Sequence, residues 1–207
     1  MSDQQVQAST TLSLEGRTAL VTGAASGLGK RIAEVFGDAG ANVVVADLRQ
    51  ADAQATADEI ARKGVKTLGI AMDVTSEQAV DDGFAQVQKQ LGAVDILVSN
   101  AGIQIVAPIQ DFTFANWKKL LAVHLDGGFL TSRAAVRQMI ASGRGGSIIF
   151  MGSVHSKEAS KLKSPYVTAK HGLEGLAKVI AKEGAAHNIR SNVICPGFVR
   201  TPLMEKQ

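Results

Sequence analysis

Six short apolar runs, separated by longer stretches with helical spacing, constrain this chain to one class of fold. Strands that alternate with helices in this way build a parallel sheet covered by helices on both faces. Residues 41–47 are largely apolar without alternation, as expected of a strand buried on both faces. The predicted strands are Thr18–Thr22, Asn42–Ala46, Lys66–Ala71, Val94–Ser99, Gly146–Met151 and Ile189–Ile194, and the predicted helices lie near Gly27–Ala39, Gln50–Lys63, Ser76–Leu91, Asn116–Ser142 and Pro165–His187. We therefore predict the α/β class, with a Rossmann-type doubly wound parallel sheet.

Length and charge limit the organisation and the partners of the chain. Its 207 residues suffice for one domain, which we expect over residues 16–207 after a loose polar tail over 1–15. The net charge of +3 and the few aromatic residues argue against nucleic-acid binding. No apolar run approaches the ~20 residues of a membrane span, and the start does not have the pattern of a signal peptide. The single cysteine, Cys195, permits no internal disulfide, which fits a reducing, cytoplasmic compartment.

A glycine-rich loop follows the first predicted strand, where residues 22–29 read TGAASGLG. Gly23, Gly27 and Gly29 allow a sharp turn and a close approach of the backbone to a pyrophosphate. Ser26 and Leu28 stand at the start of the next helix, whose free N–H groups and dipole attract phosphate. A tight turn without a ligand is the alternative. We expect these five residues to bind a dinucleotide.

Acidic residues at the ends of the next two strands indicate which dinucleotide is bound. Asp47 lies about 20 residues beyond the glycine loop, where a carboxylate can accept hydrogen bonds from the ribose hydroxyls of NAD. It would repel the extra phosphate of NADP, although Arg49 nearby weakens that preference. Asp73 and Val74 are placed to contact the adenine. Either aspartate could instead cap a helix.

Two further loops follow the fourth and sixth strands and so reach the same edge of the sheet. Asn100, Ala101 and Gly102 combine an amide with small residues that permit close approach to the cofactor, and a simple turn is the alternative. The loop after the sixth strand is rich in glycine and proline and is placed near the nicotinamide. Its predicted cofactor contacts are Pro196, Gly197, Val199 and Thr201.

The only tyrosine, Tyr166, stands four residues before Lys170 on one face of a predicted helix. A phenol with a pKa of about 10 must exchange a proton near neutrality, and an ammonium at ~4 Å could lower that pKa to ~7. Ser153 follows the fifth strand and can hydrogen-bond a substrate oxygen near Tyr166. Ser156 and Ser160 are alternatives for that role. The alternative interpretation of Tyr166 and Lys170 is a surface tyrosine beside a surface lysine, without a catalytic role.

Together these motifs resemble the short-chain dehydrogenase/reductase family, over residues 17–201 and in the family's order. The resemblance implies hydride transfer between a nicotinamide and an alcohol or ketone. It implies that Tyr166 donates or accepts the proton, that Lys170 holds the ribose and lowers the tyrosine pKa, and that Ser153 positions the substrate.

Within that family the chain resembles the bacterial D-3-hydroxybutyrate dehydrogenases more closely, through the segments 100–104, 152–155, 163–166 and 196–203. That resemblance implies NAD-dependent oxidation of (R)-3-hydroxybutyrate to acetoacetate, by a homotetramer. It implies that the substrate carboxylate is held by Gln104, His155, Lys163 and Gln207. Lys157 and Lys161 are alternatives for the cation. A 3-oxoacyl thioester reductase and a non-catalytic NAD-binding protein are the alternative functions.

Two features depart from the family pattern. His124 stands where the family usually has an asparagine that supports a proton relay to the lysine, so it either continues that relay or is a packed helix residue. The chain ends at Gln207, whereas family members usually continue into a substrate lid and a last strand. We therefore expect a Rossmann-type domain that lacks those parts.

Overall fold

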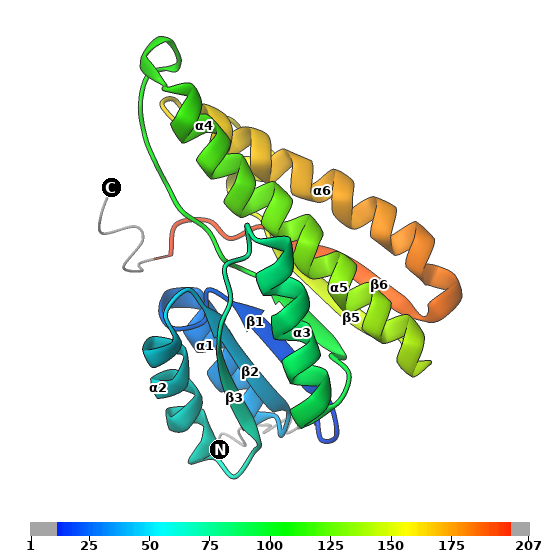
Figure 1. Cartoon of the computed structure of the whole chain (residues 1–207). Helices are drawn as coiled ribbons and strands as arrows, with labels where there is room; N and C mark the ends of the chain where they lie inside the picture. Colours follow the sequence, from blue (N-terminus) through cyan, green and yellow to red (C-terminus); the bar gives the residue numbers. More distant parts are fainter. Residues whose placement is uncertain (1–11, 200–207) are drawn as a thin grey trace, which may run out of the picture.

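The computed structural model describes residues 12–199, in which a six-stranded parallel sheet is flanked by helices (Figure 1). The strand order is β3-β2-β1-β4-β5-β6, so the chain winds outward in one direction from β1 and then in the other. The strands are β1 Thr18–Thr22, β2 Asn42–Asp47, β3 Thr67–Ala71, β4 Ile96–Ser99, β5 Gly146–Met151 and β6 Ile189–Ile194. The predicted fold class and all six predicted strands are confirmed, with small shifts at strand ends.

Helices pack on both faces of the sheet, and each face has its own apolar core. Residues of α1 and α2 pack on one face, and residues of α3, α5 and α6 pack on the other. The helices are α1 Gly27–Asp38, α2 Gln50–Ala61, α3 Glu77–Leu91, α4 Phe114–Leu121, α5 Gly127–Ser142 and α6 Ser164–Gly184. No helix within residues 12–199 is long and apolar enough to cross a bilayer.

The central strands are apolar throughout because successive side chains enter different cores. Leu20 and Val44 belong to the core under α3, α5 and α6. Val21, Val43 and Val45 belong to the core under α1 and α2. Side chains alternate between the two faces of a strand, so two buried faces require a continuous apolar run. This is the physical reason why the strands could be read from the sequence.

The predicted helix over Asn116–Ser142 is divided into two helices by a wider turn. It begins earlier than predicted, at Phe114, because the Thr113 hydroxyl accepts a hydrogen bond from the backbone N–H of Asn116 at 3.2 Å. A π-helical segment, Ala122–Asp126, then joins α4 to α5. A π turn accommodates one extra residue and is frequent at functional sites.

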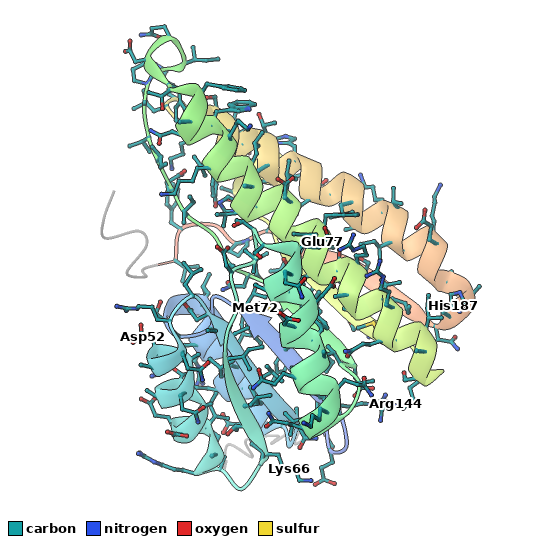
Figure 2. All side chains as sticks on the ribbon, in the orientation of Figure 1. Asp52, Lys66, Met72, Glu77, Arg144 and His187 are labelled. Carbon is teal, nitrogen blue, oxygen red and sulfur yellow. The ribbon has the colours of Figure 1, made fainter. Side chains whose placement is uncertain are left out.

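A buried ion cluster closes the edge of the sheet at the amino ends of the strands. Asp95 is 3% exposed and accepts hydrogen bonds from Arg17 at 3.2 Å, from Arg144 at 2.8 Å and from the backbone N–H of Thr18 at 2.9 Å. Arg144 lies at the same end of the sheet as Lys66, which directly precedes β3 (Figure 2). Asp95 thus ties together segments that are distant in sequence.

We expect Asp95→Ala to lower the free energy of unfolding by about 2 kcal/mol, measured by urea denaturation. The substitution leaves a buried N–H and two guanidinium groups without their partner. Since both arginine side chains are about half exposed, water compensates part of the loss. Glu183→Ala, at an exposed carboxylate of α6, is the control and should change stability by less than about 0.5 kcal/mol. Equal effects of the two variants would contradict the role of Asp95.

Candidate active site

One cavity of about 620 Å³ opens at the carboxyl ends of the strands, beside the point where the winding direction reverses. It brings together nearly all the residues that the sequence singled out. Those lining it are Gly23, Ser26, Gly27, Leu28, Asp47, Asp73, Val74, Asn100, Ala101, Gly102, Gln104, His124, Ser153, His155, Lys163, Tyr166, Lys170, Pro196, Gly197 and Val199. Gly29 does not line the cavity, and Thr201 and Gln207 lie outside the described residues.

The glycine loop contains a turn with positive φ angles and leads into a helix whose first N–H groups have no side-chain cap. Gly23 and Gly27 have φ angles of +62° and +57°, a region that other residues rarely adopt. Ser26 begins α1 without a side-chain cap, so the first N–H groups of that helix remain available to an anion. A Cβ on Gly29 would meet the carbonyl oxygen of Gly23 and the amide of Asn100. Gly29 therefore allows the start of α1 to pack closely on the loop, and its predicted contact with the cofactor stays a prediction.

Neither of the two aspartates caps a helix. Asp47 accepts hydrogen bonds from the backbone N–H groups of Ala25 at 3.0 Å and Leu48 at 2.8 Å, which ties the end of β2 to the glycine loop. Asp73 accepts hydrogen bonds from the N–H and hydroxyl of Thr75 at 2.9 and 2.7 Å. The residues at the helix N-caps are Arg49 and Ser76 instead. Asp47 and Asp73 thus belong to the cavity wall.

Asn100 fastens β4 to the glycine loop. Its side-chain amide donates to the carbonyl oxygens of Thr22 at 2.8 Å and Gly23 at 3.2 Å. The Thr22 hydroxyl accepts from the N–H groups of Asn100 at 2.9 Å and Ala101 at 3.0 Å. This segment is more than a simple turn, and Thr22 is a supporting residue that our sequence analysis did not assign. A hydroxyl at the last position of a strand, directly before the glycine loop, was the available signal.

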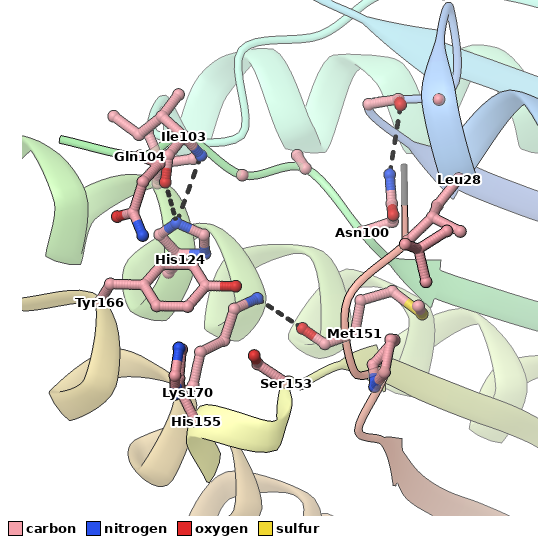
Figure 3. A pocket seen from close by; sticks show the side chains of 18 of the residues that line it. Leu28, Asn100, Ile103, Gln104, His124, Met151, Ser153, His155, Tyr166 and Lys170 are labelled. Atoms are coloured by element: carbon pink, nitrogen blue, oxygen red, sulfur yellow. Dashed lines mark hydrogen bonds between the residues drawn. The ribbon is translucent and has the colours of Figure 1, made fainter. Parts of the chain in front are cut away.

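Tyr166, Lys170 and Ser153 meet at one end of the cavity (Figure 3). Tyr166 and Lys170 lie one turn apart on α6, and the lysine Nζ is 5.3 Å from the centre of the phenol ring. Lys170 is buried and donates to the carbonyl oxygen of Met151 at 2.6 Å. Burial lowers the pKa of Lys170 to about 8. Ser153 begins the 3₁₀ turn Val154–Ser156 that follows β5.

The pKa of Tyr166 is raised above its ordinary value, because burial disfavours the phenolate. A hydrogen bond with the Ser153 hydroxyl opposes this effect. The expected net lowering of this pKa by Lys170 is therefore not found in the protein alone, where burial has the larger effect. The ammonium faces the ring of Tyr166 and is bonded to a backbone carbonyl, and it does not outweigh the cost of burying the phenolate.

The alternative residues for the serine and the cation do not line the cavity. Ser156 is 2% exposed, and its hydroxyl accepts from the backbone N–H of Ser153 at 3.2 Å. Ser160 does not line the cavity, and neither do Lys157 and Lys161. Lys157 instead forms an ion pair with Glu174 at 2.7 Å.

Gln104, His155 and Lys163 line the cavity near Tyr166. The rings of His155 and Tyr166 stand edge to face with their centres 6.1 Å apart. Within residues 12–199, the Gln104 Oε1 and the His155 Nδ1 are buried without a hydrogen-bond partner. Burial and the positive charge of Lys163 lower the pKa of His155. Beside Lys170, this end of the cavity therefore offers a second cation, Lys163, and two side chains with free polar atoms.

Several lining residues carry no chemical signal of their own and were missed by our sequence analysis. They contribute apolar side chains or backbone groups, and each lies close in sequence to a predicted motif. They are Leu48, Ile103, Val123, Met151, Gly152, Val154 and Phe198. Within residues 12–199, no group of three or more histidine, cysteine or acidic side chains is arranged to hold a metal ion.

Comparison with known proteins assigns this site to a family. A family model described as short chain dehydrogenase matches residues 17–207. The chain belongs to the short-chain dehydrogenases. A D-beta-hydroxybutyrate dehydrogenase of Cupriavidus necator is 41% identical over 194 residues, which cover 94% of this chain and 75% of that protein.

Other relatives and solved structures agree with this assignment. A 3-oxoacyl-(acyl-carrier-protein) reductase of Aquifex aeolicus is 36% identical over 193 residues, covering 93% of this chain and 77% of that protein. The crystal structure of a short-chain type dehydrogenase/reductase from Mycobacterium marinum superposes with a TM-score of 0.91 at 38% identity. That superposition covers 95% of this chain and 78% of the other.

As a short-chain dehydrogenase the chain is an oxidoreductase of a family that uses NAD or NADP. The residues present fit such a dinucleotide. The start of α1 offers free N–H groups for the pyrophosphate, and a Cβ on Gly23 would lie 2.9 Å from the Cα of Ala101, so a larger residue would disturb the cradle. Asp47 lines the same cavity from the end of β2, at the place where a ribose is recognised in such folds.

Proposed function

We propose that this short-chain dehydrogenase catalyses the NAD-dependent oxidation of (R)-3-hydroxybutyrate to acetoacetate, and the reverse reaction. The observation that carries this proposal is the group of Gln104, His155 and Lys163 beside Tyr166. A short hydroxy acid has its carboxylate a few ångströms from the reacting carbon, so it needs a cation and hydrogen-bond donors close to the catalytic phenol. The likeness to the Cupriavidus necator enzyme supports the same substrate.

The choice of NAD rests on Asp47. A carboxylate at the end of β2 can accept hydrogen bonds from both ribose hydroxyls and repels a ribose phosphate. Its bonds to Ala25 and Leu48 hold it toward the cavity. Arg49, the cation two residues beyond Asp47, is paired with Asp52. When bound, the nicotinamide supplies the position that accepts or returns the hydride.

Three side chains of the site transfer the proton, orient the substrate and provide positive charge. The Tyr166 hydroxyl oxygen takes the proton from the substrate alcohol, or returns it to the ketone. The Ser153 hydroxyl donates a hydrogen bond to the same substrate oxygen and orients it. The Lys170 ammonium provides positive charge beside the phenol, which favours the phenolate when the proton is accepted.

A second candidate is the reduction of a 3-oxoacyl thioester, which the relative in Aquifex aeolicus favours by its name. With NADP as the cofactor, this reaction is opposed by Asp47, whose carboxylate repels the ribose phosphate. Thioesters also lack the carboxylate that Lys163 would bind. Turnover measured with each substrate, and with NAD and NADP separately, distinguishes the two candidates.

The test of the proposed function is NADH formation from NAD and (R)-3-hydroxybutyrate, compared with Lys163→Met. We expect turnover by the parent protein and a rise of about 10- to 100-fold in KM for the hydroxy acid in the variant, because a charge-assisted hydrogen bond is lost. The kcat and the affinity for NAD should change little. Lys161→Met is the matched control, since Lys161 does not line the cavity, and it should behave as the parent.

Three outcomes would contradict the proposal. Parent protein that forms NADH from other alcohols and none from the hydroxy acid would rule out the substrate. An unchanged KM in Lys163→Met would rule out the carboxylate site. Tight NAD binding without turnover of any alcohol would favour a non-catalytic NAD-binding protein.

A further inference from the structure

Leu162 has a backbone conformation that leucine rarely adopts. Its φ angle is +68°, in the left-handed region, where a bulky side chain is disfavoured. Within residues 12–199, Asn188 is the other residue besides glycine with a positive φ, and asparagine tolerates that region. Strain of this kind persists only where the surrounding structure holds it. The Leu162 side chain is 49% exposed, so its own packing does not explain the strained turn.

The strained residue joins two loops that form the cavity. The Leu162 carbonyl oxygen accepts a hydrogen bond from the backbone N–H of Ala107 at 3.0 Å. Ala107 lies in the segment after β4, three residues beyond Gln104, and Leu162 lies directly before Lys163. The two segments meet at one end of the molecule, near α4 (Figure 1). This bond therefore connects the stretch that carries the Gln104 amide with the stretch that carries the Lys163 ammonium.

The direction of the chain at Leu162 determines where Lys163 stands. Lys163 is the N-cap residue of α6, and its carbonyl oxygen accepts from the N–H of Val167 at 2.9 Å, so its backbone is fixed to the helix. The Lys163 side chain lines the cavity. Its charge helps to lower the pKa of His155, which lines the same cavity, so the ammonium acts on the imidazole.

We propose that Leu162 is a positioning residue, whose left-handed backbone, held by the Ala107 N–H, keeps Lys163 in the cavity with Gln104 and thereby sets the affinity for the substrate carboxylate. The inference deepens the proposed function and rests on it in taking Lys163 as the cation that binds this carboxylate. A turn that served only to begin α6 would instead place Tyr166, and its loss would lower kcat.

The kinetic test compares Leu162→Ile with Leu162→Asn, and the conservative replacement should be the worse one. Isoleucine has the same atoms as leucine, but its branched Cβ further disfavours a positive φ. The fraction of molecules with Lys163 in the cavity falls, so KM for the hydroxy acid should rise about fivefold to tenfold. Asparagine changes the side chain more but adopts the left-handed region, so KM should stay within about twofold of the parent. In both variants, kcat and the affinity for NAD should stay within about twofold.

A double variant shows whether Leu162 acts through Lys163. In the Lys163→Met background the cation is already absent, so adding Leu162→Ile should change KM by less than about twofold. Effects of the two substitutions that multiply would contradict the inference, because Leu162 would then act on the substrate through another group.

A second measurement needs no turnover. Since the charge of Lys163 helps to lower the pKa of His155, NMR titration of that ring should give a higher pKa in Leu162→Ile, shifted toward the value in Lys163→Met. The Leu162→Asn variant should match the parent. Glu158, the acidic group that raises the pKa of His155, is the same in all variants. Amide exchange at Ala107 should accelerate in Leu162→Ile and stay unchanged in Leu162→Asn.

Three further results would overturn the inference. They are an equal KM in Leu162→Ile and the parent, a higher KM in Leu162→Asn than in Leu162→Ile, or a loss confined to kcat. If the parent does not oxidise the hydroxy acid, the proposed function fails, while the His155 titration and the Ala107 exchange still decide whether Leu162 positions Lys163.

Discussion

Tyr166→Phe should reduce kcat by about 10³-fold, because the substrate oxygen loses the only phenol that can exchange its proton. Phenylalanine keeps the ring that packs against His124 and Lys170 and removes a single oxygen. The affinity for NAD, measured by calorimetry, should therefore stay within about threefold of the parent. Steady-state NADH formation over a range of pH gives kcat, and the residual activity of the variant should no longer follow the parent's pH profile.

The raised pKa of Tyr166 sharpens this prediction. A phenol that holds its proton firmly in the protein alone can donate it readily to a developing alkoxide, which is the step of the reductive direction. Lys170, whose pKa is lowered to about 8, begins to lose its charge within the pH range of the assay. Activity of Tyr166→Phe within tenfold of the parent would mean that another group moves the proton.

Gly29→Ala should weaken NAD binding by more than about 100-fold, although Gly29 itself does not line the cavity. A methyl group there would overlap the carbonyl of Gly23 and the amide of Asn100. These two groups are joined by a hydrogen bond that holds the glycine loop in place. Relief of the overlap requires the loop to move away from the start of α1. We also expect unfolding to become about 1–3 kcal/mol easier, as in other overpacked interiors.

The matched control for this substitution is Gly175→Ala, in the exposed part of α6. A Cβ at Gly175 would have no neighbour within 4 Å, and alanine favours helix over glycine by about 1 kcal/mol. That variant should bind NAD as the parent does and should be equally or more stable. Calorimetry for binding and thermal unfolding for stability distinguish the two glycines. Equal binding by both variants would show that the loop tolerates the overlap.

The sequence alone was sufficient for the sheet and for most of the cavity wall, for identifiable physical reasons. Val43 and Val45 enter one core and Val44 enters the other, so the strand is apolar at each of these positions. Parallel strands end at a shared edge, so motifs that follow separate strands, such as Asp47 and Asn100, were expected to meet there. The first of these inferences depends on the local sequence pattern, and the second depends on the topology of a parallel sheet.

What the sequence could not supply depends on contacts between distant segments. The π turn Ala122–Asp126 contains His124, whose ring contacts Gly102 and Ile103, and a helical period does not reveal such a turn. The raised pKa of Tyr166 follows from burial, which the spacing of Tyr166 and Lys170 cannot report. The packing role of Gly29 follows from its closeness to Asn100, which directly follows β4.

The two edges of the sheet have separate tasks, and this separation has a consequence for how such a protein can change. Asp95 and its arginines hold the amino ends of the strands, while the cavity opens at their carboxyl ends. Loops at the second edge can be exchanged without touching the ions that secure the first. A scaffold organised in this way lets new substrate preferences be selected, or engineered, at little cost to folding, with Lys163 and Gln104 as natural starting positions.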